Sequence, residues 1–370
     1  MNYYIIAGEA SGDLHGSNLI HALRRHDPDA VIRCWGGDKM QAAGGTLVKH
    51  YRELAFMGFS EVIMNLRTIF RNLAFCKEDI LQHKPDTLIL IDYPGFNLRI
   101  AKWAKEQGIK VVYYISPQVW AWKAGRVKMM KECISRMLVI LPFEKEYFKK
   151  NWEWEVEYVG HPLIEAIQKE GLQTASHKPQ GVNRIVALLP GSRKQEILKK
   201  LPVMLEVSKY FPDHQFIVAG APGMDPGFYA PLMAPYPNVS LLQNKTYDLL
   251  SKADAALVTS GTATLDTALF GVPEVVCYKA SWLSYQIGKR VVDIKYICLV
   301  NLIMDKLVVK EMIQDDMTTE NLRKELELLL HDETYRSRIK ADYAALRELL
   351  HQGGDASEKA ALSIVKFLAQ

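Results

Sequence analysis

The sequence has few cysteines and no sign that they pair or bind metal. Its five cysteines are scattered, odd in number and without the close spacing of a disulfide framework or a zinc site. We therefore expect reduced thiols, most of them in the core. No group of His, Cys and carboxylate residues has metal-ligand spacing, so the sequence predicts chemistry that needs no metal and no other cofactor.

Long apolar runs and a leader segment are also missing. The chain starts directly with MNYYIIAGEASGD, without the basic region, apolar stretch and cleavage site of a signal peptide. No later run approaches the roughly 20 apolar residues that cross a bilayer. The sequence thus predicts a cytoplasmic protein that is neither secreted nor membrane-spanning.

Charge of one sign is not in excess. The 46 Lys and Arg residues nearly balance the 42 Asp and Glu residues, which leaves a net charge of +4. Nucleic-acid binding needs a concentrated basic face, so we expect no nucleic-acid partner. The glycine-rich segments also lack the GxGxxG order of a dinucleotide site, and hydride transfer is therefore unsupported.

The sequence does contain short apolar runs that alternate regularly with amphipathic stretches, the pattern of βαβ units. The alternation weakens over 171–183, a polar stretch with Gly and Pro. We predict an α/β fold of two Rossmann-like, doubly wound domains facing a central cleft, 1–170 and 184–350, with 171–183 as linker and a last helix within 351–370. The expected strands are Tyr3–Ala7, Val31–Trp35, Thr87–Asp92, Val111–Ser116, Met137–Pro142, Arg184–Pro190, Gln215–Ala219, Val239–Leu242, Ala255–Thr259 and Glu274–Tyr278.

The first expected strand ends in GEASGDLHG and leads straight into a helix. Glycines there permit close backbone approach, and the helix start can receive an anion or a sugar hydroxyl. A plain strand-to-helix turn with a capping side chain is the structural alternative. The candidate cleft residues of this segment are Gly8, Glu9, Ser11, Gly12 and Asp13.

Asp92 ends the apolar run TLILID. A carboxylate at the carboxyl end of a buried strand faces the expected cleft, and partial burial would raise its pKa into the range of a general base. The alternative is a helix cap ahead of Asn97. After the next strand, YYISPQVWAWK offers Ser116, Gln118 and Trp120 either to a sugar ring or to the core.

Two segments of the second domain have the features of a nucleotide site. In LLPGSRKQE, backbone N–H groups at Ser192 and the guanidinium of Arg193 are suited to a diphosphate, although an exposed turn would look alike. In SGTATLD, small residues at a helix start can hold a phosphate, and Asp266 one turn later can accept the ribose hydroxyls; a capped buried helix is the alternative. The helix-start residues are Ser260, Gly261 and Thr262.

Residues 58–80 predict a helix with an apolar stripe and basic flanks. Such a helix can lie on an anionic membrane surface, or its stripe can be an ordinary core face. The residues expected to contact the membrane are Val62, Ile63, Leu66, Arg67, Ile69, Phe70, Arg71 and Leu73.

Nine segments together resemble the lipid-A-disaccharide synthase family, in the family's order and over nearly the whole chain. They are GEASGD, MGFSEV, LILIDYPGFN, YYISPQVWAWK, LPFEK, VGHP, LLPGSRKQE, SGTATLD and NLIMDKLVVKEMIQ. The resemblance implies an inverting, metal-independent transferase of GT-B architecture. It also implies the substrates: 2,3-diacylglucosamine passes from UDP-2,3-diacylglucosamine to lipid X, and the β-1,6-linked disaccharide 1-phosphate and UDP are released.

Individual roles follow from the same resemblance. The family's essential aspartate falls on Asp92, and its diphosphate arginine falls on Arg193, with Glu196 placed to orient it. The NL…VKE match brings Asn301 and Glu311 toward the donor pocket.

The resemblance also bears on partners and location. His161 in VGHP, by itself typical of a satisfied loop histidine, joins the acceptor side, and Asp266 stands where many members carry Glu. Acylated substrates favour a peripheral position on the inner face of the inner membrane. The last helix would return to the first domain or be exchanged in a homodimer. The competing hypotheses are an isomerase that resembles UDP-N-acetylglucosamine epimerase and a nucleotide-sugar sensor without catalysis.

Overall fold

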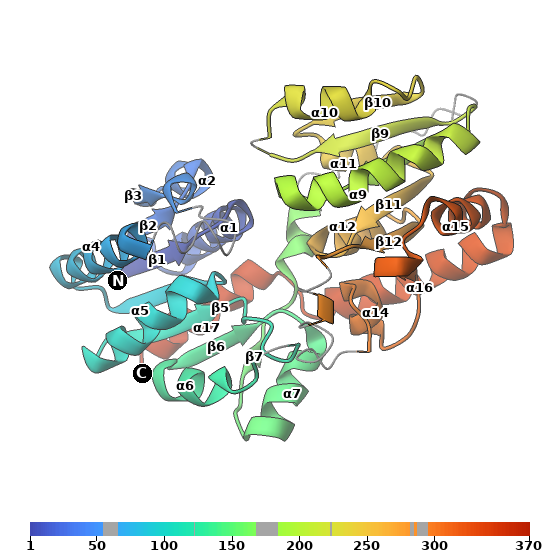
Figure 1. The fold of residues 1–370 in the computed structure, drawn as a ribbon. Coiled ribbons are helices and arrows are strands. Elements are labelled where there is room, and N and C mark those ends of the chain that lie inside the picture. Colours follow the sequence, from blue (N-terminus) through green and yellow to red (C-terminus); the bar gives the residue numbers. More distant parts are fainter. Residues whose placement is uncertain (55–65, 122, 168–183, 223, 282–284, 287–294) are drawn as a thin grey trace. The chain divides into compact units, whose positions relative to one another are not determined.

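The computed structural model describes residues 1–370 except 55–65, 122, 168–183, 223, 282–284 and 287–294, so the predicted linker 171–183 lies outside the described residues. The described chain forms two compact units, each with its own parallel sheet (Figure 1). Met1–Pro162 and Leu350–Gln370 make up the first unit, and Leu163–Leu349 make up the second.

The first unit has a parallel sheet in the order β3-β2-β1-β4-β5-β6-β7. From β1 the chain winds outward to β3, and it then returns to pair β4 with the other side of β1. The sheet is therefore doubly wound, as predicted, with its topological switch point between β1 and β4. Its strands are β1 (Asn2–Ala7), β2 (Val31–Gly36), β3 (Thr46–His50), β4 (Thr87–Ile91), β5 (Lys110–Tyr114), β6 (Arg136–Val139) and β7 (Glu157–Tyr158).

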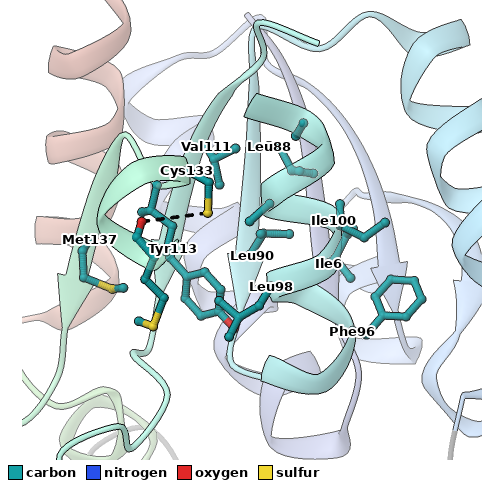
Figure 2. Close-up of a cluster of buried hydrophobic side chains, with 14 of the residues drawn as sticks. Ile6, Leu88, Leu90, Phe96, Leu98, Ile100, Val111, Tyr113, Cys133 and Met137 are labelled. Carbon is teal, nitrogen blue, oxygen red and sulfur yellow. Dashed lines mark hydrogen bonds between the residues drawn. The ribbon is translucent and has the colours of Figure 1, made fainter. Parts of the chain in front are cut away.

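Helices cover both faces of this sheet because successive strand residues point to opposite sides. Ile6 and Leu90 belong to the core beneath α4 to α7, and Figure 2 shows them beside Ile100 of α5. Ile5 and Ile89 belong to the opposite core, beneath α1, α2 and α17. The helices are α1 (Ala10–His26), α2 (Asp38–Ala42), α4 (Leu66–His83), α5 (Pro94–Glu106), α6 (Arg126–Cys133), α7 (Pro142–Trp152) and α17 (Ala356–Leu368), with the 3-10 turn η1 at Tyr51–Glu53.

The second unit repeats the design with the strand order β10-β9-β8-β11-β12-β13, all parallel. Its switch point lies between β8 and β11. The strands are β8 (Ile185–Leu189), β9 (Gln215–Gly220), β10 (Val239–Gln243), β11 (Ala255–Thr259), β12 (Glu274–Tyr278) and β13 (Lys310–Ile313). The helices are α9 (Lys194–Val207), α10 (Pro226–Met233), α11 (Thr246–Leu250), α12 (Thr262–Leu269), α14 (Leu299–Met304), α15 (Thr319–His331) and α16 (Glu333–His351), with 3-10 turns η2 (Ser208–Tyr210) and η3 (Gln314–Asp316).

The sequence did not predict β3, β7 and β13. All three are edge strands, and their side chains are largely half-exposed, so they lack the continuous apolar run of the central strands. Several predicted strands were also too long by one to three residues. The chain turns after Ile91 and Tyr114 because Asp92 and Ile115 adopt positive φ of 45° and 68°.

The predicted last helix is α17, which packs on α1 of the same chain and belongs to the first unit (Figure 1). Asp355 caps it by accepting the N–H of Glu358 at 3.1 Å. Just before the helix, Gly353 lies against Gly160. A Cβ added at Gly353 would stand 2.2 Å from the Gly160 Cα, so this backbone contact requires glycine.

Candidate active site

The switch point of the first sheet holds Asp92 at the carboxyl end of β4. Asp92 and Tyr93 both adopt left-handed backbone, with φ of 45° and 49°, which is costly for residues other than Gly. Two buried side chains stabilise this turn. The hydroxyl of Tyr113 and the amide of Asn97 donate to the Asp92 carbonyl at 2.6 and 2.8 Å. The backbone around the carboxylate is therefore fixed by the core below it.

Gly8, at the end of β1, lies directly beneath Tyr93. A Cβ at Gly8 would stand 2.3 Å from the Tyr93 ring, so glycine is what lets this ring cover the strand end. Gly12 permits a close contact between α1 and the end of β1, because a Cβ added at Gly12 would stand 3.1 Å from the Ala7 side chain. These two glycines bring the start of α1 close to Asp92.

The Asp92 carboxyl group has an unusual acidity. Burial and the nearby carboxylate of Glu9 raise its pKa to about 6, while the backbone N–H of Tyr93 lowers it. Glu9 and Ser11 are exposed at the same sheet edge. At neutral pH Asp92 is ionised and is a stronger base than an ordinary carboxylate, which suits it to accept a proton from a hydroxyl.

The pH dependence of activity should follow this acidity. If ionised Asp92 is the base, kcat/KM should fall about tenfold per pH unit below a midpoint near pH 6. Glu9→Gln removes a like charge, so the pKa of Asp92 should fall and the midpoint should move to lower pH. Initial rates between pH 4.5 and 8.5 provide the measurement. A midpoint that stays in place would show that Glu9 does not act on the titrating group.

Asp13 is a correction to the expected cleft residues. It is 3% exposed, and its carboxylate accepts the backbone N–H groups of Gly37, Lys39 and Met40 at 2.7, 3.1 and 3.0 Å. It therefore caps the start of α2 from α1, which satisfies donors that a helix start leaves unpaired. Both carboxylate oxygens are used in this way, so Asp13 supports the site from below.

A second group of residues follows β5 and β6 at the same edge of the first sheet. Glu144, 1% exposed, accepts the N–H groups of Ile140 and Leu141 at 3.2 and 2.9 Å and faces Ser116 and Trp120. Burial raises its pKa to about 7, and these donors oppose the shift. Glu144 thus holds the backbone of the loop after β6. In the loop after β5, Gln118 is exposed.

His161 follows β7 and is buried beside His15 of α1. Burial and the neighbouring imidazole lower the pKa of His161 to about 3, and burial lowers that of His15 to about 4. Both rings are neutral at neutral pH. His161 therefore takes part in packing below the edge, which agrees with its description as a loop histidine with satisfied contacts.

In the second unit, Arg193 immediately precedes α9, after the turn that follows β8. Gly191 in that turn has φ of +111°, and a Cβ there would stand 2.8 Å from an oxygen of Glu196. The Glu196 carboxylate also pairs with the Arg193 guanidinium at 3.5 Å, and the arginine side chain is 55% exposed. Arg193 is thus oriented yet keeps most of its donors open, and Ser192 beside it is exposed.

The start of α12, after β11, is the other predicted nucleotide segment. Gly261 and Thr262 are exposed, and the Ser260 hydroxyl donates to the Ile297 carbonyl at 2.9 Å. Asp266 accepts the Tyr247 hydroxyl at 3.0 Å, so the proposed ribose carboxylate already has one protein partner. The segment retains the exposed backbone N–H groups that a phosphate would use.

Asn301 is a second correction. It is fully buried, and its amide carbonyl accepts the N–H groups of Val308 and Val309 at 2.8 and 3.0 Å. Its amide nitrogen donates to the Val309 carbonyl at 2.9 Å and to Glu311 at 3.0 Å. All four hydrogen-bonding positions are occupied. Asn301 therefore holds Glu311 in place and leaves no position for a nucleotide.

Glu311 in turn contacts the backbone that binds the start of α12. Its carboxylate accepts the N–H groups of Ile297 at 3.1 Å and Cys298 at 3.0 Å. The Ile297 carbonyl is the one that binds the Ser260 hydroxyl. Glu311 is thus connected to the predicted phosphate segment through one backbone peptide.

The sequence of this chain is similar to those of known proteins. Residues 3–365 match the family described as lipid-A-disaccharide synthetase. The lipid-A-disaccharide synthase of Geobacter sulfurreducens is 39% identical over 99% of this chain and 97% of its own length. That of Geobacter metallireducens is 40% identical with the same coverage.

The chain belongs to the lipid-A-disaccharide synthetase family.

Solved structures similar to this chain share its fold only. The glycotransferase of kitacinnamycin matches 99% of both chains with a TM-score of 0.70 and 16% identity. The UDP-GlcNAc 2-epimerase of Neisseria meningitidis, bound to UDP-GlcNAc, matches the whole of both chains with a TM-score of 0.67 and 13% identity. Glycosyltransferases of the GT-B class and epimerases thus share this α/β fold, so the fold does not distinguish between them. The sequence family is what assigns this chain.

The exposed face of α4 differs from the predicted membrane-contacting stripe. Leu73 is 7% exposed and belongs to the core, and Ile69 is half-buried against it, so neither is open to a membrane. The exposed side carries Phe70 and Phe75, which are 62% and 44% exposed. Arg67 and Arg71 are exposed with them. Val62 and Ile63 lie outside the described residues, as does the Leu66 side chain.

Among the described residues, neither a membrane-spanning helix nor a metal-binding cluster is found. In the ranges that the structure describes, no helix is long and apolar enough to cross a bilayer. The same ranges hold no group of three or more His, Cys, Asp or Glu side chains placed to bind a metal ion.

Sequence reasoning missed three residues that position the candidate site. Asn97 and Tyr113 hold the Asp92 turn, and Glu144 holds the loop after β6. All three lie within the matched segments, but nothing in a single sequence shows that buried polar side chains of separate segments meet. The one local signal is that Glu144 follows Leu141, the residue before α7, by three positions, which is the spacing of a capping box.

Proposed function

We propose that the protein transfers 2,3-diacylglucosamine from UDP-2,3-diacylglucosamine to the primary hydroxyl of lipid X. The products are the β-1,6-linked disaccharide 1-phosphate and UDP. The observation that supports this most is family membership over residues 3–365. This range includes Asp92 after β4 and Arg193 after β8. The relatives carry the name of this activity, and the substrates come to this chain by that relation.

The first step of the proposed mechanism is proton removal by Asp92. Its carboxylate, with a pKa near 6, takes the proton of the acceptor hydroxyl as that oxygen attacks the anomeric carbon of the donor. The bond between this carbon and the UDP oxygen breaks in the same displacement, with inversion. The fixed backbone around Asp92 supports this role, because a base must be held in place to act.

The second unit would stabilise the leaving group. Negative charge develops on the diphosphate as the bond breaks, and the Arg193 guanidinium together with backbone N–H groups of Ser192, Gly261 and Thr262 is suited to bind it. Glu196 pairs with Arg193 and sets its direction. No step of this mechanism requires a metal ion.

The acyl chains of both substrates call for contact with a membrane, and we assign this contact to the exposed face of α4. Phe70 and Phe75 would enter the interface while Arg67 and Arg71 contact anionic headgroups. This assignment keeps the predicted helix and replaces its buried residues with those that are exposed. The protein would then act at the inner face of the inner membrane.

A charge placed in this face should weaken membrane binding. Phe70→Asp is expected to lower the fraction bound to vesicles of phosphatidylethanolamine and phosphatidylglycerol about tenfold, because one exposed aromatic ring no longer enters the interface. Sedimentation with vesicles measures this. Leu328→Asp on α15, at a side chain 42% exposed, is the matched control and should bind normally. Equal binding by both variants would remove α4 from the proposal.

The function itself is tested by product analysis. The purified protein is mixed with UDP-2,3-diacylglucosamine and lipid X in detergent micelles, and products are identified by mass spectrometry. We expect the disaccharide 1-phosphate and an equal amount of UDP. Conversion of UDP-N-acetylglucosamine to an isomer, without disaccharide, would favour the epimerase hypothesis. UDP binding without any turnover of the lipid pair would leave the sensor hypothesis.

A further inference from the structure

Lys200, a buried lysine in α9, has no place in the mechanism above. It is only 4% exposed and stands one helical turn after Glu196. Among the residues that the structure describes, its ammonium group makes no hydrogen bond or ion pair. Burial lowers the pKa of Lys200, and the carboxylate of Glu196 opposes this shift. Buried lysines are rare without a partner, so the missing partner needs an explanation.

The neighbours of Lys200 place it near the carboxyl edge of the second sheet. The thiol of Cys277 in β12 is close enough for the lysine charge to lower its pKa against the effect of burial. Cys277 pairs in register with Thr259, the last residue of β11. In-register residues of adjacent parallel strands point to the same face, so Thr259 lies on the face of the sheet where Cys277 senses the charge of Lys200.

The turn after β8 closes this group. The Thr259 methyl lies 3.6 Å from where a Cβ of Gly191 would stand, and the Glu196 carboxylate lies 2.8 Å from the same point. A helical side chain points back toward the helix N-terminus, so Lys200 extends toward Glu196 and this turn. The titratable neighbours that act on it are Glu196, Cys277, Lys199 and Arg193.

Thr259 adds an independent observation. Its hydroxyl is buried and, in the described part of the chain, has no hydrogen-bond partner. Among the described residues beside this turn, the ammonium of the 4% exposed Lys200 and the buried Thr259 hydroxyl therefore both lack a hydrogen-bond partner. Such groups are costly unless something binds them, and an anionic oxygen would satisfy both.

We propose that Lys200 is a second cation of the diphosphate site and donates to a phosphate oxygen of UDP, with the Thr259 hydroxyl beside it. The inference rests on the proposed function, because it takes the nucleotide to bind at the Arg193 edge. Arg193 would bind the diphosphate from its exposed side and Lys200 from beneath. The leaving group would then meet positive charge on two sides as the sugar bond breaks.

A purely structural role for Lys200 predicts something different. The i, i+4 spacing from Glu196 permits a stabilising pair on a helix. If that pair were the reason for the lysine, its removal would lower the stability of the empty protein. If Lys200 instead serves to bind a ligand, replacing it with an uncharged side chain of similar length should leave the ligand-free protein at least as stable as the unsubstituted one.

The test compares Lys200→Met with Lys199→Met, which removes the same charge from the exposed neighbouring residue. UDP, uridine and inorganic diphosphate are titrated into each full-length protein by calorimetry, and thermal unfolding is recorded without ligand. We expect Lys200→Met to weaken UDP and diphosphate by at least about tenfold, as loss of one charge-assisted hydrogen bond does. Uridine affinity and the unfolding temperature should not fall, and Lys199→Met should match the unsubstituted protein.

Two results would overturn the inference: undiminished UDP affinity in Lys200→Met, or an equal loss of affinity for uridine. If undiminished affinity comes with a lower unfolding temperature, the structural pair with Glu196 is established instead. If the unsubstituted protein binds inorganic diphosphate but no UDP, the proposed function fails and Lys200 is judged on the diphosphate titration. Binding of neither ligand would overturn both proposals.

Discussion

Asp92→Asn is expected to lower turnover about 10³-fold, since removal of a positioned general base costs about 10² to 10⁴. Affinity for UDP should stay within about tenfold, because Asp92 is assigned to the acceptor and the nucleotide to the second unit. Asn is the appropriate replacement at this position. It tolerates left-handed backbone better than other L residues, so the turn held by Asn97 and Tyr113 should survive.

The matched control for this experiment is Asp86→Asn. Asp86 is exposed and stands just before β4, whereas Asp92 stands just after it, so both changes remove one carboxylate from an end of the same strand. The control should keep full turnover. Disaccharide formation by Asp92→Asn at more than a tenth of the original rate would show that another group deprotonates the acceptor.

The second large effect is expected for Gly353→Ala. The new methyl group would stand 2.2 Å from the Gly160 Cα, and no flexible side chain can move aside, so the backbones must separate. Separation pulls α17 away from the core that it shares with α1, where Ala360 and Ile364 are fully buried. We expect a loss of about 3 kcal/mol in the free energy of unfolding, at the upper end of overpacking effects.

Differential scanning calorimetry provides the measurement, with a decrease of about 8 °C expected for a unit of this size. Gly95→Ala in α5 is the control. No atom lies within 4 Å of the Cβ that it would add, so its unfolding temperature should stay equal or rise slightly. An unchanged temperature for Gly353→Ala would mean that the two glycines do not touch in solution. A shift to dimer in light scattering would show that α17 is exchanged when its own contact fails.

Much of the fold could be predicted because the central strands are buried on both faces. Runs such as TLILI in β4 are continuous apolar segments, which marks them as inner strands of a parallel sheet. The edge strand β3 reads TLVKH and has half-exposed side chains, so its pattern resembles a loop. Strand ends were overestimated where a left-handed residue such as Asp92 turns the chain, because backbone angles leave no mark on hydropathy.

The site was predictable only where one segment contains the whole feature. The glycine turn before Arg193 and the carboxylate after β4 are local, and both were expected. The role of Asp13 depends on amides of Gly37 and Met40, and that of Asn301 depends on Val308 and Glu311. Contacts of this kind appear only when separate segments pack together, so both residues were assigned to ligands when they serve the framework.

Lys200 is the converse case, a residue that sequence reasoning did not assign to the site. In the sequence it is one of several lysines in LLPGSRKQEILKK and has the same chemistry as its neighbour Lys199. Helical phase decides that one side chain is exposed and the other buried, and the value of a buried charge depends on what surrounds it. Sequence periodicity can indicate the phase, but it does not reveal that the buried lysine lacks a partner.

Because α17 belongs to the first unit, the second unit can be completed first during synthesis. Domains commonly fold as they leave the ribosome, N-terminal part first. Here the N-terminal unit lacks its last helix until the C-terminal residues have been translated, while Leu163–Leu349 is continuous and emerges earlier. Until then the core that contains Ile89, Val112 and Leu138 lacks the side chains of α17. The nascent chain must therefore carry an unfinished apolar surface through most of translation, a natural target for a chaperone.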